Sequence, residues 1–298
     1  MSIWKEISQQ LNQKKRLYLL TVIANEGSSP GKKGFKMFVN DSGDLFGSIG
    51  GGIMEFDLIE EAKRNLKNGI QKNYLKEQIH QKNVEKSSGM ICSGKQTIMF
   101  HFLNQSFLPT IEKIIHSKSE TIYWNLNSIS LQKSGDIFYQ EKVIQKSELH
   151  IIGGGHISLA LSEFASKLDF KITVYDNRTK LNTLESNIFA DVKKVINYED
   201  ISSFIQHKEE AYIVIMTNKF TDDFIVLKNL LEFQFKYIGI LGSKAKLTNM
   251  WNSYKKQGIS EDKLQQVHAP IGLSIKSETP HEIAISILSE IILVKNKT

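Results

Sequence analysis

Residues 149–178, LHIIGGGHISLALSEFASKLDFKITVYDNR, constrain the fold of this chain more than any other stretch. A short apolar run at 149–152 has the composition of a β-strand and ends at three glycines. A helical pattern follows, and a second strand-like run at 170–175 then stops at Asp176. The apolar face of the expected helix carries Ile157, Leu161, Phe164, Ala165 and Leu168. Strand, glycine turn, helix, strand and acid make up the nucleotide-binding βαβ unit.

The glycine pattern reads Gly153-x-Gly155-x-x-Ser158, so that a serine takes the place of the third glycine. Glycines permit a tight turn and let a ligand approach the backbone, and the free N–H groups at a helix start suit a phosphate. Serine is small enough for close packing of helix against strand. The alternative is a tight turn without a ligand, and the pattern alone leaves dinucleotide binding open.

Three polar residues flank this turn. Asp176 lies where such folds bind a ribose hydroxyl, and Arg178 would suit a phosphate on that ribose. His156 directly follows the glycines, where it can either cap the helix or touch a ligand. The sequence does not decide between these two roles for His156.

The second half of the chain alternates regularly between strand and helix patterns. We predict strands at residues 149–152, 171–175, 192–196, 212–216 and 237–241, and helices at 157–168, 201–206, 222–232, 244–257 and 280–294. This order predicts a Rossmann-like, doubly wound parallel sheet. Ser243 and Lys244 follow the last strand at a helix start and could cradle an anion, although solvent exposure is the simpler role for such a lysine.

The first half has a mixed pattern and predicts an α+β domain with glycine loops. Helices are expected at residues 3–13, 53–66 and 108–116. Strands are expected at 17–24 and from the turn at 92–94 to residue 103, with a hairpin at 35–39 and 45–46 and a surface loop at 78–88. We therefore predict an N-terminal domain at residues 1–105, a connector with short strands at 106–147, and the Rossmann-like domain at 148–298.

Three small-residue loops in the first half, at residues 27–34, 47–52 and 89–94, suggest a shared site. Gly50, Gly51 and Gly52 precede a helix and could form a backbone nest for an anion. Cys92 is the single cysteine and lies in the third loop, where a thiol can react or hold a soft metal. A buried thiol in a packed turn is the alternative.

Composition excludes several classes of protein. One cysteine rules out an intramolecular disulfide and a cysteine-rich zinc site. The net charge is +6, but the basic residues are spread out, so we expect no nucleic-acid partner. No apolar run approaches the roughly 20 residues that span a bilayer, and no signal peptide is visible. We therefore expect a cytoplasmic protein without a membrane partner.

Many separate motifs of the chain, in the same order, resemble those of the xanthine dehydrogenase accessory proteins, the XdhC/CoxI maturation family. The motifs in the first half are GSSPG at residues 27–31, Lys36-Met37, GSIGGGIME at 47–55 and the loop around Cys92. Those in the second half are GGGHIS at 153–158, YDNR at 175–178, YIGILGSKAK at 237–246, HAPIGL at 268–273 and TPHEIAISILSEI at 279–291.

The resemblance implies a chaperone for the molybdenum cofactor (molybdopterin) that binds the cofactor, aids its sulfuration by a cysteine desulfurase and inserts it into a molybdenum hydroxylase of the xanthine dehydrogenase type. It implies an accessory factor rather than an enzyme, with no catalytic residue, and leaves a homodimer open. The cofactor-binding residues that we predict are Gly50, Gly51, Gly52, Cys92, Gly153, Gly155, His156, Asp176, Arg178, Ser243 and Lys244, with Cys92 as the metal ligand.

The chain departs from the family pattern at Ser93, at Ser158 and at residues 217–219, where Thr-Asn-Lys replaces a usual Thr-His-Asp. The last change removes a histidine and an acid, which argues against catalysis by that loop. Two alternatives remain, an NAD(P)-dependent oxidoreductase and a nucleotide-sensing module, because the glycine fingerprint is common to all three functions.

Overall fold

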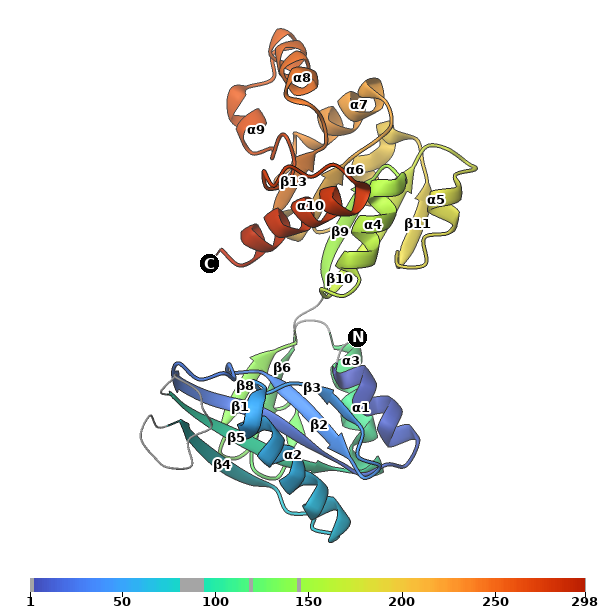
Figure 1. Ribbon diagram of the computed structural model, residues 1–298. Helices are drawn as coiled ribbons and strands as arrows, with labels where there is room; N and C mark the ends of the chain where they lie inside the picture. Colours follow the sequence, from blue (N-terminus) through green and yellow to red (C-terminus); the bar gives the residue numbers. More distant parts are fainter. Residues whose placement is uncertain (1–2, 81–93, 118–119, 144–145, 298) are drawn as a thin grey trace. The chain divides into compact units, whose positions relative to one another are not determined.

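The computed structural model describes residues 3–80, 94–117, 120–143 and 146–297 (Figure 1). The chain divides into two compact units, Met1–Gln145 and Lys146–Thr298. Most of the stretch that we predicted as a connector, residues 106–147, therefore lies within the first unit.

The first unit is built on a five-stranded antiparallel sheet with the order β3-β2-β1-β5-β4. Its strands are β1 (Leu17–Gly27), β2 (Lys36–Asn40), β3 (Leu45–Gly47), β4 (Tyr74–His80) and β5 (Gly94–Leu103). The predicted hairpin is confirmed by the pairing of β2 with β3. The predicted loop at 78–88 is wrong for its first residues, because Gln78 to His80 continue β4 and pair with β5. Polar residues can form a strand when a neighbouring strand supplies the hydrogen bonds.

Helices cover both faces of this sheet. The helix α2 (Gly52–Lys67) packs its buried residues Leu58, Ile59, Ala62 and Leu66 on one face, as its apolar spacing predicts. On the other face lie α1 (Ile3–Asn12), the 3-10 turn η1 (Gln105–Phe107), α3 (Leu108–His116) and a small sheet of β6 (Thr121–Trp124), β7 (Ile129–Ser130) and β8 (Tyr139–Lys142). Trp124 of β6 is fully buried between these elements, which ties the stretch after residue 105 into the core of the first unit.

The second unit contains a five-stranded parallel sheet with the order β11-β10-β9-β12-β13. The strands are β9 (Ser147–Ile152), β10 (Phe170–Asp176), β11 (Val192–Val195), β12 (Tyr212–Ile215) and β13 (Tyr237–Ile240). The predicted doubly wound α/β fold is confirmed, including the parallel pairing of β9 with β10. The chain order reverses beside β9, so the carboxyl ends of β9 and β12 flank the point where such sheets bind ligands.

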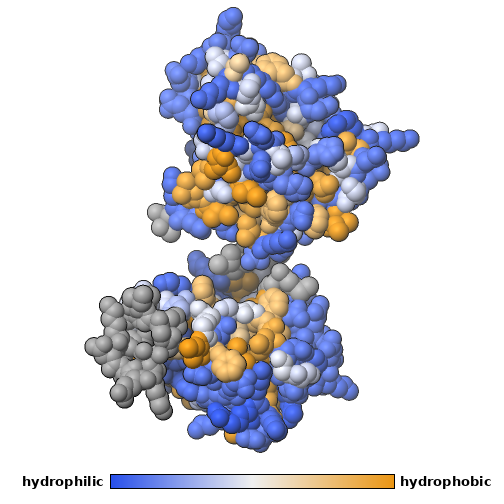
Figure 2. Space-filling view, viewed as in Figure 1, coloured by the Kyte–Doolittle hydropathy of each residue, from blue (hydrophilic) through white to orange (hydrophobic). Residues whose placement is uncertain are grey.

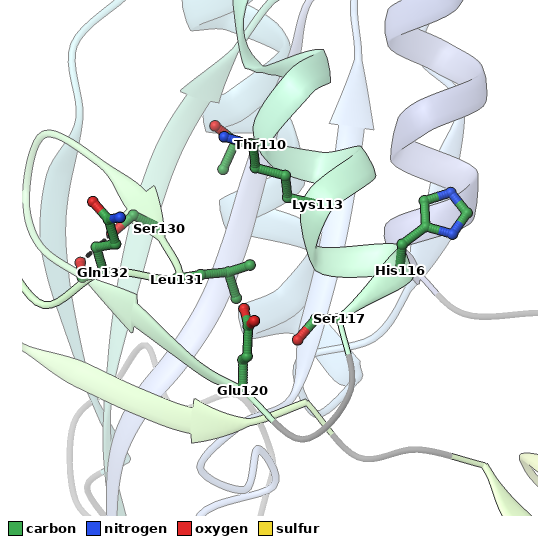
Figure 3. A pocket seen from close by; sticks show the side chains of 8 residues that line it. All are labelled: Thr110, Lys113, His116, Ser117, Glu120, Ser130, Leu131 and Gln132. Atoms are coloured by element: carbon green, nitrogen blue, oxygen red, sulfur yellow. Dashed lines mark hydrogen bonds between the residues drawn. The ribbon is translucent and has the colours of Figure 1, made fainter.

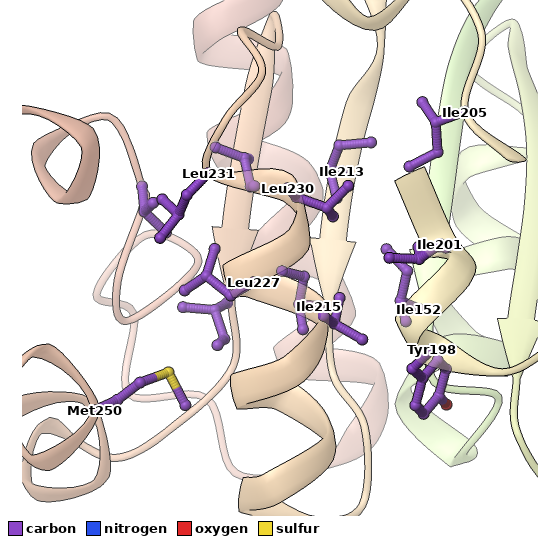
Figure 4. Close-up of a cluster of buried hydrophobic side chains, with 14 of the residues drawn as sticks. Ile152, Tyr198, Ile201, Ile205, Ile213, Ile215, Leu227, Leu230, Leu231 and Met250 are labelled. Atoms are coloured by element: carbon purple, nitrogen blue, oxygen red, sulfur yellow. The ribbon is translucent and has the colours of Figure 1, made fainter. Parts of the chain in front are cut away.

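Two layers of helices enclose the parallel sheet. One face is covered by α4 (His156–Ala165) and α10 (Pro280–Lys295), which also pack on each other. The other face carries the cluster of Figure 4, in which buried side chains of α6 (Ile201–Phe204), α7 (Phe220–Leu230) and α8 (Lys244–Lys256) meet the strands. Short helical segments complete the unit, namely α5 (Asn182–Glu185), η2 (Tyr198–Asp200), η3 (Lys208–Glu210) and α9 (Glu261–Gln265).

Two helix ends show how local sequence sets the boundaries. The helix α10 begins with a capping box, in which the Thr279 hydroxyl accepts from the Glu282 N–H and the Glu282 carboxylate accepts from the Thr279 N–H. The helix α4 ends at Ala165, three residues before the predicted end. Leu168 therefore leaves the apolar face on which we expected it and is 38% exposed.

Apolar side chains also reach the surface of both units (Figure 2). Ile285, Ile292 and Leu293 of α10 are exposed, and Figure 2 shows apolar surface over this helix. Within the described residues, no helix combines the length and the apolar character that crossing a membrane requires.

Candidate functional site

The glycine turn after β9 forms a tight connection to α4. Gly153 has φ +109°, and a Cβ atom on it would lie 2.3 Å from the carbonyl oxygen of Met216, at the end of β12. A side chain at Gly153 would therefore be both strained and blocked. Gly155, the N-cap of α4, has an ordinary φ of −72°, and an added Cβ atom there would meet nothing within 4 Å. The first glycine thus serves the turn, whereas the space beside Gly155 is open to a ligand.

Asp176 fixes this turn from the end of β10. Its carboxylate is fully buried and accepts hydrogen bonds from the Gly154 N–H at 2.7 Å and from the Arg178 N–H at 2.9 Å. The Arg178 guanidinium adds two more, from Nε and Nη2, each at 2.8 Å. Burial alone would raise the pKa of Asp176, but the hydrogen bonds from Arg178 and Gly154 outweigh it and hold the pKa below its usual value.

The ion pair between Asp176 and Arg178 limits which groups of a ligand can bind at this position. Both oxygens of Asp176 already accept two hydrogen bonds, so a ribose hydroxyl could bind the carboxylate only by displacing one of these donors. The Arg178 side chain is 36% exposed and remains accessible. The predicted pair therefore lies together at the glycine turn, where Arg178 is the more accessible partner.

The first turn of α4 carries the other two predicted features. His156 is exposed, and its side chain does not cap the helix, because the N-cap is Gly155 and makes no side-chain hydrogen bond. Ser158 takes the third fingerprint position and is 1% exposed, which fits close packing between α4 and the sheet. Its hydroxyl has no hydrogen-bond partner among the described residues.

The loops after β12 and β13 meet through a buried acid that the sequence analysis missed. Asp223 of α7 is fully buried and accepts hydrogen bonds from the N–H and the hydroxyl of Thr217, at 2.9 and 2.6 Å, and from Lys246. Burial raises the pKa of Asp223 in spite of these bonds. Ser243 caps α8 by accepting from the Lys246 N–H, whereas Lys244, the first residue of α8, is exposed.

The HAPIGL segment is fastened to α10. The His268 Nδ1 atom lies 3.0 Å from Glu290, whose other oxygen accepts from the Tyr237 hydroxyl at 2.6 Å and from the Gly272 N–H at 2.8 Å. Burial alone would raise the pKa of Glu290, but these donors outweigh it and lower the pKa. The segment at residues 268–273 is therefore held by one ionised carboxylate of the terminal helix.

In the first unit, parts of all three small-residue loops converge. A Cβ atom on Gly50 would lie 2.5 Å from the Gly31 nitrogen, and one on Gly94 would lie 2.6 Å from the Ser29 nitrogen. Gly50 also has φ +130°. These contacts require glycine and bring residues 27–34, 47–52 and the start of β5 to one place.

The predicted anion nest before α2 is filled by a side chain of the same helix. One carboxylate oxygen of Glu55 accepts from the Ile49 N–H at 2.8 Å, the Gly51 N–H at 2.9 Å and the Ser48 hydroxyl at 2.7 Å. Burial alone would raise the pKa of Glu55, but the hydrogen bonds from Ser48 and the loop N–H groups lower it. A ligand phosphate could use the N–H donors of Ile49 and Gly51 only after Glu55 has moved.

Cys92, the predicted metal ligand, lies outside the described residues. Gly94 at the start of β5 is the nearest described residue to it in the chain. In the described stretches, no three His, Cys, Asp or Glu side chains gather in a way that could hold a metal ion.

A shallow hollow in the first unit is lined by residues that are not among the predicted site residues (Figure 3). It measures about 730 Å³ and is lined by Thr110, Lys113, His116, Ser117, Glu120, Ser130, Leu131 and Gln132. The lining is largely polar, and the side chains of Lys113 and His116 come from the exposed side of α3. It lacks the apolar walls typical of a small-molecule site, so we do not assign a ligand to it.

Comparison with known proteins relates both units to one family. The model of the XdhC Rossmann domain matches residues 149–291, and the model of the XdhC and CoxI family matches residues 10–75. Among solved structures, a xanthine dehydrogenase from Bacillus halodurans superposes with a TM-score of 0.81 and 24% identity, covering 100% of this chain and 97% of its own. That likeness supports the fold.

Two curated proteins are also similar in sequence. The uncharacterized protein YqeB of Escherichia coli (strain K12) is 25% identical over 99% of this chain and 47% of its own length. A probable xanthine dehydrogenase subunit of Bacillus subtilis (strain 168) is 26% identical over 53% of this chain and 46% of its own length. The chain thus spans about half the length of YqeB, and the second match covers about half of each protein.

Proposed function

The chain belongs to the XdhC and CoxI family, and from this premise we propose that it is an accessory protein for a molybdenum hydroxylase of the xanthine dehydrogenase type. The similarity to a probable xanthine dehydrogenase subunit from Bacillus subtilis supports this association. In its finer form, the proposal is that the protein binds the molybdenum cofactor, holds it during sulfuration by a cysteine desulfurase, and passes it to the hydroxylase.

The open position beside Gly155 carries this proposal. A phosphate placed there would face the start of α4, where helix N–H groups favour an anion, and Arg178 would add a cation nearby. The residues of the second unit therefore fit the phosphate end of the cofactor. When bound, the cofactor supplies the metal centre that receives sulfur, and the residues of this chain bind and orient it.

The first unit fits the cofactor only in part. Its loops converge at Gly31, Gly50 and Gly94, but the N–H groups of Ile49 and Gly51 serve Glu55. We propose that these loops contribute to cofactor binding by the first unit. The role of Cys92 as a soft ligand to the metal, or as a neighbour of its sulfur, remains part of the proposal on sequence grounds.

The decisive variant is Gly155→Leu. The backbone of Gly155 suits any residue, and its Cβ direction is free, so the fold should persist with a capping cost of about 1 kcal/mol or less. The leucine side chain would fill the space that the phosphate needs. Gln265→Leu, at an exposed position of α9, is the matched control for an added apolar side chain.

Each protein is co-expressed with molybdopterin synthesis and a xanthine dehydrogenase-type hydroxylase. We then measure circular dichroism, bound molybdenum and hydroxylase activity. Wild type and Gln265→Leu should carry molybdenum and raise hydroxylase activity, whereas Gly155→Leu should fold and do neither. If wild type carries no molybdenum and the hydroxylase matures equally well without it, the proposal is wrong. Cys92→Ser, measured in the same way, tests the thiol separately.

A nucleotide-binding function is the second candidate, because the turn at Gly153 and the acid at Asp176 are also the features that bind dinucleotides. Titration of purified wild type with NAD and NADP distinguishes the two. Tight binding of either dinucleotide, together with turnover of NADPH on carbonyl compounds and no bound molybdenum, would favour an oxidoreductase. Dinucleotide binding without turnover would favour a nucleotide sensor.

A further inference from the structure

The side-chain amides of Gln96 and Gln78 form a buried hydrogen-bond network, which we call the relay, beside the converging loops of the first unit. The side-chain oxygen of Gln96 accepts from the Ser29 hydroxyl at 2.9 Å and from the Gly31 N–H at 3.1 Å. The Gln96 amide nitrogen donates to Gln78 at 2.8 Å, and the Gln78 nitrogen donates to the Met54 carbonyl at 3.0 Å. The relay therefore runs from the loop at 27–34 through β5 and β4 to the first turn of α2.

The direction of this relay is fixed at both ends. The Gly31 N–H can only donate, so the atom of Gln96 that faces it must be the oxygen. The Met54 carbonyl can only accept, so the atom of Gln78 that faces it must be the nitrogen. The remaining oxygen of Gln78 then meets the remaining nitrogen of Gln96, and every hydrogen bond in the relay has a donor and an acceptor.

The relay is buried and follows from strand register. Gln78 and Gln96 are direct cross-strand partners in β4 and β5, and they are 9% and 2% exposed. Ser29 is 4% exposed. Buried polar groups are costly unless all are satisfied, and a fully satisfied network favours one arrangement over its alternatives.

The relay acts at the contacts that require glycine. The Gln96 oxygen lies 2.4 Å from the place where a Cβ atom on Gly31 would stand, and Gly31 in turn touches Gly50. Gly94, two residues before Gln96, lies so close to Ser29 that an added Cβ atom would stand 2.6 Å from the Ser29 nitrogen. A shift of either glutamine would therefore displace the loop at 27–34 and, through Gly50, the loop at 47–52.

We propose that Gln78 and Gln96 are positioning residues that hold these two glycine loops in the arrangement that receives the molybdenum cofactor. This inference rests on the proposed cofactor role of the first unit. The glutamines act through the loops and need not touch the cofactor themselves.

The chain offers a closely matched control. Gln10 of α1 is also 9% exposed, and its side chain also accepts one hydrogen bond, from Asn40, and donates one, to Glu6. Gln78→Met and Gln10→Met therefore each remove one accepted and one donated hydrogen bond from equally buried positions. Only Gln78→Met breaks the link between β5 and α2. Gln96→Met is a harsher third variant, because it leaves the Gly31 N–H without its acceptor and removes one of the two acceptors of the Ser29 hydroxyl, the other being the Gly31 carbonyl.

Two measurements are made on full-length wild type and the variants, namely amide hydrogen exchange in peptides that cover residues 27–34 and 47–56, and bound molybdenum after co-expression with molybdopterin synthesis. We expect Gln78→Met to speed exchange in both loops by about tenfold, the effect of losing roughly one or two hydrogen bonds, and to lower the molybdenum content severalfold. Gln10→Met should match wild type in both.

Equal loop exchange in Gln78→Met and Gln10→Met would overturn the positioning role, even if Gln96→Met fails to fold. If wild type carries molybdenum and Gln78→Met carries as much, the positioning role is also wrong, whereas the proposed function stands. A wild type that carries no molybdenum refutes the cofactor role itself, and with it the purpose that we assign to the relay.

Discussion

The guanidinium of Arg178 donates one 2.8 Å hydrogen bond to each carboxylate oxygen of Asp176. Because Asp176 is fully buried and also accepts from the Gly154 N–H, this pair fastens the glycine turn to the end of β10. Arginine suits this role since its planar fork matches the geometry of a carboxylate. The pair is thus part of the turn's structure as well as a candidate contact for a ligand.

The first prediction concerns the removal of this acid. Asp176→Ala should lower the free energy of unfolding by about 3 kcal/mol, because it leaves the Gly154 N–H and the Arg178 guanidinium without their acceptor. The folded-state pKa of Asp176 is lowered, so its stabilisation is complete above the ordinary carboxyl pKa and disappears as the pH falls through the folded-state pKa. Urea denaturation between pH 7 and pH 3 measures both effects.

The control for Asp176 is Glu209→Ala, which removes an exposed acid from the same unit and should change stability by less than about 0.5 kcal/mol. A loss no larger for Asp176→Ala than for Glu209→Ala would show that the buried pair does not hold the turn.

The second unit could be predicted closely because its signals are local. An apolar run, glycines, a helical period and a capping proline each depend on neighbours in the sequence, and they located β9, β10, α4 and α10 to within a few residues. The misplaced end of α4 shows the limit of this reasoning. Leu168 fits the helical period of the sequence, but the helix ends at Ala165, so the period does not determine where Leu168 lies.

The residues that the sequence analysis missed act across long separations in the chain. Nothing near Gln78 indicates that Gln96 is its cross-strand partner, and a polar run around it predicted a loop. Asp223 has the ordinary place of an acid in the first turn of a helix, and only the fold brings Lys246 to it. Pairing of this kind depends on strand register and helix packing, which a single sequence does not fix.

The site in the first unit was predicted only in its glycines. Their number suggested convergence, and the contact of Gly50 with Gly31 is the convergence that the structure describes. The occupant of the nest was missed, although the acid in the first turn of α2 was visible in the sequence. An acid at this place is favourable to the helix dipole in any case, but the Glu55 carboxylate folds back onto the loop that precedes the helix.

The second prediction tests that contact. Glu55→Ala should destabilise the protein by about 1–2 kcal/mol, because the N–H groups of Ile49 and Gly51 lose their acceptor at the start of α2. The pKa of Glu55 is lowered in the folded state, so its contribution is present above its unfolded pKa and is lost as the pH falls through the folded-state value. Chemical denaturation at pH 7 and at pH 3.5 measures the change.

Glu60 lies on the exposed side of the same helix, and its one ion-pair partner among the described residues is Lys63, three residues later, so Glu60→Ala is the appropriate comparison. It should cost less than about 0.5 kcal/mol at either pH. Equal effects of the two substitutions would contradict a specific role of Glu55 in holding the nest.

The third prediction concerns a partly buried ion pair beside the loop at 27–34. The Lys36 ammonium lies 2.6 Å from Glu141 and 5.3 Å from the centre of the Trp124 ring, and the lysine side chain is only 9% exposed. Burial lowers the pKa of Lys36, although Glu141 opposes this effect. Glu141→Gln should cost about 2 kcal/mol, because it leaves the Lys36 ammonium without its counter-charge and with the Gly34 carbonyl as a neutral acceptor, whereas Lys36→Met combined with Glu141→Gln should recover much of the loss.

A double-mutant cycle on Lys36 and Glu141, read by urea denaturation, measures this coupling. The cycle on Lys255 and Glu261 is its control, since that pair has a similar separation of 2.8 Å but both side chains are exposed. The exposed pair should give less than about 1 kcal/mol. A coupling for Lys36 and Glu141 no larger than this would show that burial does not strengthen their interaction.

The last prediction is a pH dependence that originates at His101 of β5. This side chain is fully buried and lies 2.8 Å from the Asn125 carbonyl, so Nε2 carries the proton and the neutral ring is the stable form. Burial lowers the pKa of His101 to about 4. An unfolded histidine has a pKa of about 6.5, so the unfolded chain binds more protons between these values and stability must fall as the pH drops from about 6.5 to 4. The expected loss is about 3 kcal/mol, since each pKa unit corresponds to about 1.4 kcal/mol.

His101→Gln, whose amide can donate to the same carbonyl, should remove this loss, whereas substitution of the exposed His116 by Gln should leave it in place. Urea denaturation at intervals between pH 7 and pH 4 measures the slope. If wild type and His101→Gln lose stability in parallel over this range, His101 is not the group that takes up the proton.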